Sequence, residues 1–289
     1  RIKIEVQSTI SFNSLKMTIN CNGKLIDLDY PKVMGILNCT PDSFFDGGTY
    51  KNESEILTQV EKMLSEGATF IDVGAYSSKP NAAFVSEEEE TNRLLPIVDL
   101  LMHHFPSILL SIDTFRASVA ERAIHSGAVI INDISAGSLD RNMFSTVARL
   151  QVPYIMMHMK GTPQTMQTLT QYQNICKEMR YYFSEKVAQA RQLGINDLII
   201  DPGFGFAKTV EQNFEVLQKL ELFTALEIPL LVGVSRKSMI YKSLEITPQE
   251  SLNGTSILNT IEIKKGAKIL RVHDVKEAVQ CIELVHKIA

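Results

Sequence analysis

Polar residues recur where short apolar runs of the chain end, and their types suit the binding of a heterocycle. Asn38, Asp113, Asn132 and Asp201 each follow such a run, and Lys237 lies in a polar stretch after another. A 2-amino-4-oxo pyrimidine ring, as in a pterin or guanine, presents an N–H and an NH₂ side by side. One carboxylate accepts both donors, while an amide or a lysine meets the ring carbonyl. Asp113, Asn132, Asp201 and Lys237 are therefore the predicted heterocycle site.

A second set of residues suits a polyphosphate. It combines one neutral oxygen ligand with several basic groups, namely Asn38, Lys79, Arg271 and His273. Such a set predicts a diphosphate site with Mg²⁺ bound at Asn38. The stretch Ser235-Arg236-Lys237-Ser238 is predicted to open a helix, and its free N–H groups and hydroxyls would hold a carboxylate. The chain thus predicts three subsites, for a heterocycle, a pyrophosphate and a small anion.

Each of these residues also has a purely structural interpretation. His273 with Asp274 would also serve as the cap of the last helix, and Lys237 would also be an ordinary surface lysine. His158 stands among methionines, and we interpret it as a packed histidine outside the site.

The elements that must position these residues alternate regularly between short apolar strands and amphipathic helices. The strands are predicted at 33–38, 69–73, 108–112, 128–132, 153–157, 198–201, 229–234 and 268–271. The helices are predicted near 53–66, 87–104, 115–126, 140–150, 173–193, 210–225, 248–265 and 274–288. Eight such units predict a (β/α)₈ TIM barrel, in which functional groups gather at the carboxyl ends of the strands. An open doubly wound sheet is the alternative, but the Gly-x-Gly-x-x-Gly turn typical of its nucleotide-binding form does not follow the first strand.

The N-terminal part and the acidic run have simpler interpretations. Residues 17–28 surround Asn22-Gly23, a strong hairpin signal, and predict a β-hairpin that closes the bottom of the barrel. Residues 1–16 are an N-terminal extension of uncertain origin, and residues 17–289 form a single predicted domain. Ser86 to Glu89 is typical of a capping box, so the run Glu87–Glu90 is interpreted as a solvated first turn of a helix.

The totals exclude several classes of protein. The net charge of −4 and pI near 5.9 come without a basic stripe, so we expect no nucleic-acid partner. No apolar stretch of about 18 residues predicts a membrane span, and the N-terminus lacks a secretory h-region. The four cysteines are scattered without paired spacing, which favours reduced thiols in a cytoplasmic protein over a zinc site.

Six short blocks of the sequence, in order, resemble the dihydropteroate synthase family of pterin-binding enzymes. The blocks are Asn38-Cys39-Thr40-Pro41-Asp42-Ser43-Phe44, Ser111-Ile112-Asp113-Thr114, Ile131-Asn132-Asp133-Ile134, Met157-His158-Met159, Asp201-Pro202-Gly203-Phe204-Gly205-Phe206, and Ser235-Arg236-Lys237-Ser238 with Arg271-Val272-His273-Asp274. The resemblance runs from about residue 33 to the C-terminus.

This resemblance implies a reaction and a role for each matching residue. The amine of 4-aminobenzoate would attack the methylene carbon of 7,8-dihydropterin-6-ylmethyl diphosphate, and pyrophosphate would leave. The implied pterin ligands are Asp113, Asn132, Asp201 and Lys237, with Asp113 and Lys237 as catalytic residues. The implied diphosphate ligands are Asn38, Lys79, Arg271 and His273, with Mg²⁺ on Asn38. The aminobenzoate side would be lined by Ser78, Pro80, Phe206, Ser235 and Ser238. The resemblance also implies sulfonamide inhibitors and a homodimer.

The sequence departs from the family pattern in one loop, and two rival functions stay open. The loop reads Ala75-Tyr76-Ser77-Ser78-Lys79-Pro80-Asn81 where the family usually has Gly-Glu-Ser-Thr-Arg-Pro-Gly, so Lys79 keeps the charge but loses the two-pronged geometry of arginine. One rival is a pterin-binding methyltransferase of the methyltetrahydrofolate type. The other is a barrel that binds pterin without catalysis. Release of pyrophosphate would separate the predicted function from both.

Overall fold

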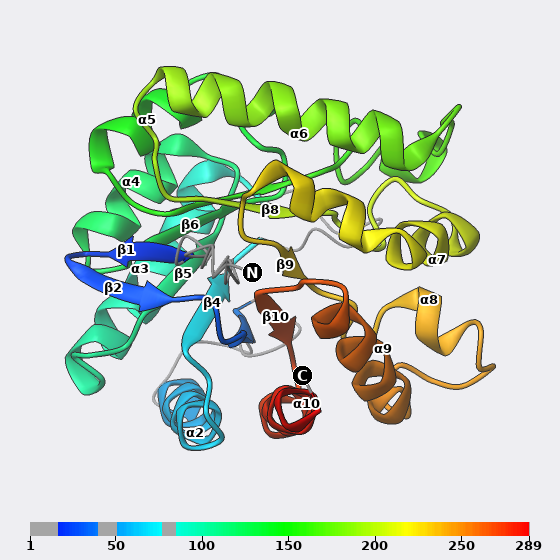
Figure 1. The fold of residues 1–289 in the computed structure, drawn as a ribbon. Coiled ribbons are helices and arrows are strands. Elements are labelled where there is room, and N and C mark those ends of the chain that lie inside the picture. The colour runs from blue at the N-terminus through cyan, green and yellow to red at the C-terminus, as the bar shows by residue number, and fades with distance from the viewer. Residues whose placement is uncertain (1–16, 40–50, 77–84, 289) are drawn as a thin grey trace, which may run out of the picture.

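The computed structural model describes residues 17–39, 51–76 and 85–288, which form an eight-stranded parallel barrel surrounded by helices (Figure 1). Its strands are β3 (Lys32–Asn38), β4 (Phe70–Gly74), β5 (Leu110–Asp113), β6 (Ile130–Asp133), β7 (Tyr154–Met157), β8 (Leu198–Asp201), β9 (Leu231–Val232) and β10 (Ile269–Val272). They pair in the order β8-β7-β6-β5-β4-β3-β10-β9. A parallel bridge between Ile200 and Leu230 joins the two ends. The predicted (β/α)₈ barrel is confirmed.

The helices lie between the strands, close to their predicted positions. They are α2 (Lys51–Ser65), α3 (Glu87–His104), α4 (Ala117–His125), α5 (Met143–Leu150), α6 (Ile175–Gln192), α7 (Val210–Gln218), α8 (Ser238–Tyr241), α9 (Leu252–Lys264) and α10 (Val275–Lys287), with short 3₁₀ segments η1 (Met166–Thr168) and η2 (Leu220–Leu226). The helix predicted over 210–225 is thus split. Leu220 and Phe223, three residues apart, are both buried in η2, as the threefold repeat of a 3₁₀ helix allows. None of the described helices has the length and apolar composition that a bilayer span requires.

An N-terminal hairpin closes the amino end of the barrel, as predicted. Strands β1 (Thr18–Cys21) and β2 (Lys24–Asp27) pair antiparallel around Asn22-Gly23. The inner face of the hairpin shares one apolar cluster with the lowest inward-pointing residues of the barrel strands. The cluster comprises Ile19, Cys21, Ile26, Leu28, Met34, Phe70, Leu109, Val129, Ile130, Ile155, Ile199, Leu231 and Ile269. Burial of these side chains fastens the hairpin to the barrel.

Side chains along each strand alternate, so residues two positions beyond this apolar layer point inward again, nearer the carboxyl ends. Those positions are occupied by Asp72, Asn132, Asp201 and Arg271, which follow Phe70, Ile130, Ile199 and Ile269 by two residues. The strand pattern therefore delivers polar groups into the upper half of the barrel.

The acidic run at the start of α3 corrects one prediction. Ser86 caps the helix, and its Oγ accepts the Glu89 N–H at 3.1 Å. The Glu89 carboxylate contacts Arg93 instead of completing a capping box. Glu90 is fully buried, so its interpretation as part of a solvated turn is wrong. It lies on the inner face of the helix, where Arg116 and Thr114 from the loop after β5 contact its carboxylate.

Candidate active site

A network of four buried or partly buried polar side chains occupies the carboxyl end of the barrel. Asp72 Oδ2 accepts hydrogen bonds from Arg271 Nε at 2.7 Å and from Asn132 Nδ2 at 3.0 Å. Arg271 Nη2 donates to Asp113 Oδ2 at 2.9 Å. These contacts join strands β4, β5, β6 and β10 across the barrel. The network brings together Asp113 and Asn132 of the predicted pterin set and Arg271 of the predicted diphosphate set.

The charges in this network are held in unusual states. Burial raises the pKa of Asp113 to about 7, although Arg271 acts to lower it and Asp72 adds to the rise. Burial disfavours the charged form of Arg271, but Asp72 and Asp113 outweigh that effect and the pKa of Arg271 is raised. The arginine therefore stays cationic, while Asp113 is poised to change its protonation state near neutral pH.

Asp201 and Lys237 form a second group on the same rim, beside the loop that follows β8. Asp201 Oδ1 accepts the Gly203 N–H at 2.8 Å, and Lys237 Nζ donates to the Phe204 carbonyl. The lysine ammonium also lies 5.0 Å from the centroid of the Phe206 ring. Burial lowers the pKa of Lys237 to about 8, with Asp201 opposing the change, and burial raises the pKa of Asp201. The structure thus brings together the predicted residues Asp201, Lys237 and Phe206.

Ser235 and His273 form a third pair between the ends of β9 and β10. Ser235 Oγ lies 3.0 Å from His273 Nδ1 and accepts the His273 backbone N–H at 3.2 Å. Burial lowers the pKa of His273 to about 4, and the nearby cations Arg271 and Arg236 lower it further. At neutral pH His273 is therefore an uncharged imidazole, which would meet a diphosphate as a hydrogen-bond donor and not as a cation.

The stretch after β9 is less helical than expected. α8 is a single turn that begins at Ser238, and Ser238 is partly exposed. Arg236 pairs with Asp274 through Nε–Oδ2 at 3.0 Å and Nη2–Oδ1 at 2.5 Å. The pair links this stretch to the start of α10, so Asp274 serves Arg236 and gives no side-chain cap to the helix.

The remaining predicted residues lie at the edge of the described structure. Asn38 ends β3 and is exposed, and its neighbour Cys39 is buried, as expected for a small packed side chain. Burial raises the pKa of the Cys39 thiol to about 12, so it stays protonated. Ser78, Lys79 and Pro80 lie outside the described residues. Within the described ranges, no group of three or more His, Cys, Asp or Glu side chains is arranged to hold a metal ion.

Asp72 is a polar residue of the second strand to which the sequence-based prediction assigned no role in the site. It is fully buried, and Oδ1 has no hydrogen-bond partner in the described part of the chain. A single acid inside the otherwise apolar strand Phe70–Gly74 is the signal that marks it. The prediction left it out because its two partners come from strands far along the chain.

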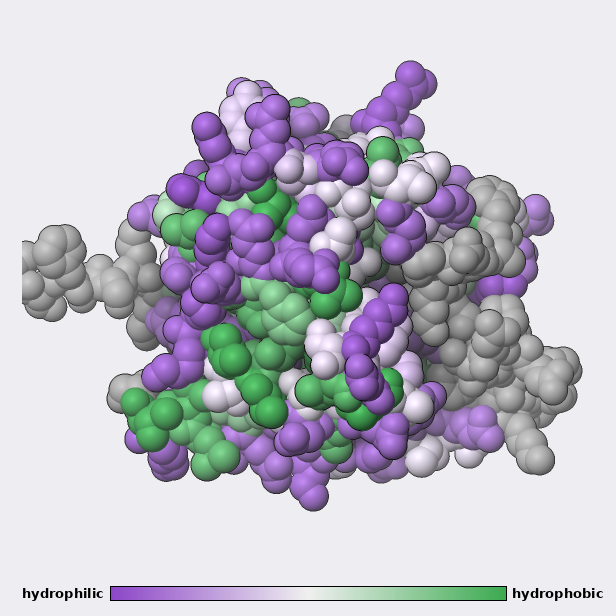
Figure 2. Space-filling view, turned by 90° about the vertical axis from the view of Figure 1, so that its right-hand side faces the viewer, coloured by the Kyte–Doolittle hydropathy of each residue, from purple (hydrophilic) through white to green (hydrophobic). Residues whose placement is uncertain are grey.

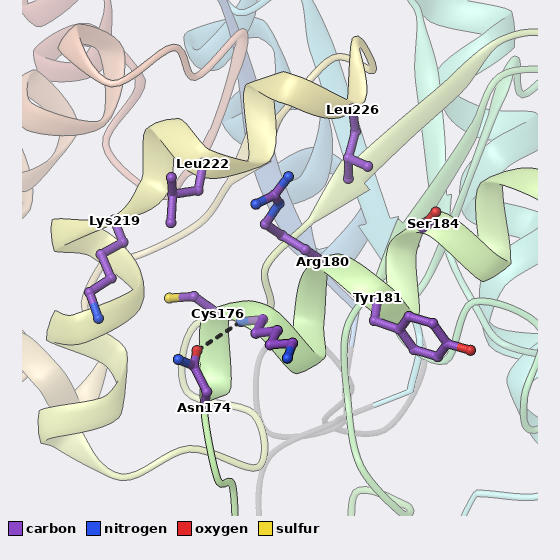
Figure 3. A pocket seen from close by; sticks show the side chains of 9 residues that line it. Asn174, Cys176, Arg180, Tyr181, Ser184, Lys219, Leu222 and Leu226 are labelled. Atoms are coloured by element: carbon purple, nitrogen blue, oxygen red, sulfur yellow. Dashed lines mark hydrogen bonds between the residues drawn. The ribbon is translucent and has the colours of Figure 1, made fainter.

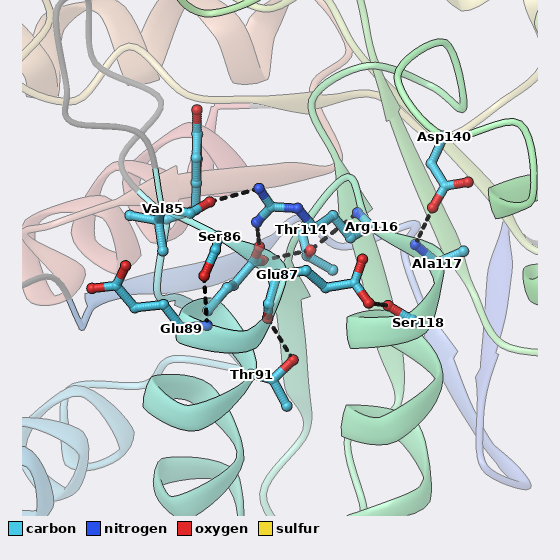
Figure 4. Close-up of polar contacts among 12 residues, drawn as sticks. Val85, Ser86, Glu87, Glu89, Thr91, Thr114, Arg116, Ala117, Ser118 and Asp140 are labelled. Atoms are coloured by element: carbon cyan, nitrogen blue, oxygen red, sulfur yellow. Dashed lines mark hydrogen bonds and ion pairs between the residues drawn. The ribbon is translucent and has the colours of Figure 1, made fainter.

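A buried ion pair behind Asp113 was also missed (Figure 4). Thr114 Oγ1 donates to Glu90 Oε1 at 2.6 Å, and Arg116 binds the other carboxylate oxygen. Arg116 Nη2 donates to the Val85 carbonyl at 2.7 Å, and its guanidinium lies 5.5 Å from the centroid of the Tyr76 ring. The pair ties the end of β5 to residues on both sides of segment 77–84.

Two cavities in the described part of the chain lie outside the polar network of the barrel mouth. One, of about 520 Å³, lies between α6 and η2, and Arg180, Leu222 and Leu226 are among its lining residues (Figure 3). The other, of about 1010 Å³, is lined by residues of the β7–α6 loop and α6, including Tyr172 and Glu178. Their described linings contain none of the predicted site residues, so the chemistry of the side chains, and not cavity size, locates the site.

The fold and its polar mouth define a pterin-binding barrel enzyme, and the chain matches the family described as "Pterin binding enzyme" over residues 34–273. Dihydropteroate synthase of Escherichia coli strain K12 is 42% identical over 271 residues, which are 93% of this chain and 95% of that protein. The enzyme of Bacillus subtilis strain 168 is 39% identical over 255 residues, 88% of this chain and 87% of that protein.

Solved structures of dihydropteroate synthases are also similar to this chain. Dihydropteroate synthase of Yersinia pestis, in a sulfonamide drug complex, matches with a TM-score of 0.88 and 40% identity, covering 94% of this chain and 99% of that chain. The Xanthomonas albilineans enzyme with 4-aminobenzoic acid matches with a TM-score of 0.88 and 34% identity, covering 95% and 98%. The chain belongs to the dihydropteroate synthase family and is a transferase of folate biosynthesis.

Proposed function

We propose that the mouth of the barrel condenses 7,8-dihydropterin-6-ylmethyl diphosphate with 4-aminobenzoate. The amine nitrogen forms a bond to the methylene carbon, the carbon–oxygen bond to the diphosphate breaks, and the amine loses one proton. The products are 7,8-dihydropteroate and pyrophosphate. The observation that carries this proposal is the convergence of Asp113, Asn132, Asp201 and Lys237 on one rim, where Asp201, Asp113 and Arg271 all lie close enough to act on the charge of Lys237.

The pterin ring would be held by complementary hydrogen bonds. Asp201 Oδ1 accepts the Gly203 N–H, which fixes the carboxylate orientation, and Oδ2 together with the second lone pair of Oδ1 would accept from the ring N–H and NH₂. Asn132 and Lys237 would meet the remaining heteroatoms of the ring. Asp113, held by Arg271, would face positive charge that develops on the pterin as the diphosphate departs. Fixed charges of this kind stabilise the transition state without having to reorganise.

The diphosphate and the aminobenzoate would lie on either side of the reacting carbon. We propose Arg271, His273, Asn38 and Lys79 for the diphosphate, and Ser78, Pro80, Phe206, Ser235 and Ser238 for the aminobenzoate. Arg271 is already bound to two carboxylates, so it would contribute its positive field and any donor still unused. The Ser235–His273 contact would couple the two subsites.

A magnesium ion would fit this arrangement as a partner of the substrate. Asn38 offers one exposed amide oxygen, and Mg²⁺ commonly takes one or two protein ligands together with substrate phosphates and water. When bound, the ion would neutralise charge on the leaving diphosphate. The binding itself is testable by titrating Mg²⁺ into the protein with pyrophosphate and comparing wild type with Asn38→Ala.

The experiment that tests the proposed function is pyrophosphate release with each substrate omitted in turn. We expect release only with both substrates, and loss of most of it in Asp113→Asn. The matched control is Asp99→Asn, because Asp99 is an exposed acid on the outer helix α3. A wild-type protein that binds the pterin diphosphate but releases no pyrophosphate with 4-aminobenzoate would contradict the proposal. A sulfonamide should compete with 4-aminobenzoate and leave pterin binding intact.

We also propose a homodimer built on the outer face of helices α7 to α9. Exposed apolar side chains on this face include Phe214, Leu244, Ile257 and Ile261. Figure 2 shows the face, with apolar residues gathered among polar ones. An apolar patch rimmed by polar residues is typical of a protein–protein interface. Light scattering should find a dimer that Ile257→Lys dissociates and that Leu25→Lys, on the distant hairpin, leaves intact.

A cytoplasmic setting completes the proposal. All four cysteines of the chain are buried and free. Unpaired thiols persist in reducing compartments, which supports this location for a protein of folate biosynthesis.

A further inference from the structure

The loop between β8 and α7, residues 202–209, orients two predicted pterin ligands through its backbone. Its Gly203 N–H donates to Asp201 Oδ1 at 2.8 Å, and its Phe204 carbonyl accepts from Lys237 Nζ. A shift of this loop would therefore turn both the carboxylate and the ammonium that face the ring. What holds the loop in place thus sets the geometry of the pterin site.

The loop has an unusual backbone that needs support from outside. Gly203, Gly205 and Ala207 all have positive φ, at 66°, 82° and 48°. A side chain at Gly203 would lie 2.4 Å from the His158 carbonyl, so the loop packs directly on the end of β7. Glycine adopts a positive φ at no cost, whereas the left-handed conformation of Ala207 persists only because surrounding contacts enforce it.

Lys208 supplies such contacts from behind the loop. Its side chain is almost fully buried, and its Nζ donates to the Gly203 carbonyl at 2.9 Å and to the Phe206 carbonyl at 2.9 Å. A third contact, at 3.2 Å, reaches His158 Nδ1. An ammonium has three N–H donors, and these contacts use all of them. Two of the acceptors belong to the loop itself.

His158 is a fixed, neutral acceptor for this ammonium. It is 3% exposed, and its backbone N–H donates to the Asp201 carbonyl at 2.9 Å. Its ring packs edge-on against Tyr182 with centroids 5.0 Å apart. Burial first, and then Lys208 and Lys160, hold the pKa of His158 well below its usual range. The imidazole is therefore uncharged at neutral pH and can accept from Lys208.

We propose that Lys208, with His158 as its acceptor, is a positioning residue for the pterin site. It holds the β8–α7 loop from behind, so that Gly203 and Phe204 keep Asp201 and Lys237 aligned. It does not itself contact the substrate. The inference rests on the proposed function only in taking Asp201 and Lys237 as ligands of the pterin.

The first test compares Lys208→Met and Lys208→Arg. Methionine keeps much of the alkyl chain and removes every donor, whereas arginine keeps the charge and donors. We expect Lys208→Met to raise the KM for the pterin diphosphate about tenfold or more and the KM for 4-aminobenzoate by a clearly smaller factor. The loop orients two proposed pterin ligands, Asp201 and Lys237, whereas Phe206 is its one residue proposed for the aminobenzoate side. Lys208→Arg should recover most of the pterin affinity.

The matched control is Lys186→Met. Lys186 is a partly buried lysine on α6 whose Nζ donates to Ser138 Oγ at 2.9 Å. Its neighbours in the described part of the chain lie outside the β8–α7 loop, with its Nζ near the rings of Phe144 and Tyr182. It should change the thermal midpoint without changing the pterin KM. If Lys208→Met fails to fold, His158→Phe keeps an aromatic ring, removes the acceptor and should raise the pterin KM by a smaller factor. A wild-type pterin KM in Lys208→Met, or in a folded His158→Phe, would overturn the inference.

The pH dependence of the pterin KM distinguishes a positioning role of Lys208 from a purely structural one. Burial lowers the pKa of Lys208 to about 7, with Lys237 and Lys160 lowering it further and Asp201 opposing them. Loss of that proton removes a donor, so the pterin KM should rise with pH in the wild type. In Lys208→Arg the part of the rise that comes from Lys208 should disappear, which leaves the titrations of Asp113 and Lys237 that both proteins share. Identical profiles would overturn the inference, whereas a wild type without turnover would instead refute the proposed function.

Discussion

The two ends of the barrel are built from the same strands, but one end is an apolar core and the other is a polar site. At the amino end, inward-pointing residues such as Phe70 and Ile199 form one apolar cluster under the hairpin. Two residues further along the same strands, Asp72 and Asp201 are buried as acids and are held by Arg271 and by the Gly203 N–H. Inward-pointing residues only two positions apart on one strand therefore serve stability at one end of the barrel and function at the other.

The two ends differ in the free energy of burying their side chains. Apolar side chains at the closed end gain free energy from burial, whereas each buried charge at the mouth must be compensated by a partner. Mutations at the closed end should therefore act on folding, and mutations at the mouth should act on binding.

Phe70→Ala should reduce the free energy of unfolding by about 3–5 kcal/mol, the usual cost of removing a buried aromatic ring. Phe70 is fully buried in the cluster at the closed end. Denaturant unfolding measures the loss, and kcat per folded molecule should stay near the wild-type value. A large increase in the pterin KM would show that the two ends are not independent.

Asp201→Asn should weaken pterin binding by about 1–3 kcal/mol, because the amide presents a donor where the ring needs an acceptor. The free energy of unfolding, in contrast to the pterin affinity, should not fall. Burial raises the pKa of Asp201 in the folded protein, so the wild-type carboxylate loses stability as pH rises. Calorimetry and thermal unfolding at pH 8 should find weaker binding in a protein at least as stable as the wild type. Pterin binding of wild-type strength would contradict the assignment.

Glu262→Gln should flatten the pH dependence of stability. Glu262 is fully buried on α9, and neither side-chain oxygen has a hydrogen-bond partner among the described residues. Burial raises its pKa well above the usual value, so the folded state holds a proton that the unfolded state releases. Between these two pKa values the wild type should lose up to about 1.4 kcal/mol per pH unit that the variant keeps. Thermal unfolding from pH 5 to 8 measures this slope, and equal slopes would mean that Glu262 is solvated.

Gly23→Ala should have the smallest effect, a loss of about 1–2 kcal/mol, because Gly23 has a left-handed φ of 83° in the hairpin turn. No atom lies within 4 Å of the added methyl group, so the cost is purely conformational. Activity should not change, because the hairpin closes the end opposite the site. A Gly23→Ala protein with altered kcat would break the comparison between the two ends.

Much of the fold could be predicted because it depends on local pattern. The alternation of apolar strands and amphipathic helices predicted the barrel, and Asn22-Gly23 predicted the hairpin that closes it. Positions at strand ends also predicted where Asp113, Asn132 and Asp201 would gather, since parallel strands of one barrel end on the same face. These inferences need only the order of residues along each strand.

Other features depended on partners that are distant in the sequence. Glu90 looks like one acid in a solvated run, and only the approach of Arg116 from the next unit buries it as an ion pair. The same holds for Lys208 and for the uncharged state of His273, since desolvation by surrounding elements sets both. The sequence by itself determined the barrel, its closing hairpin and the rim on which polar residues meet. Only the tertiary structure decided which of them pair and which are charged, because burial and long-range contacts control the free energy of each charge.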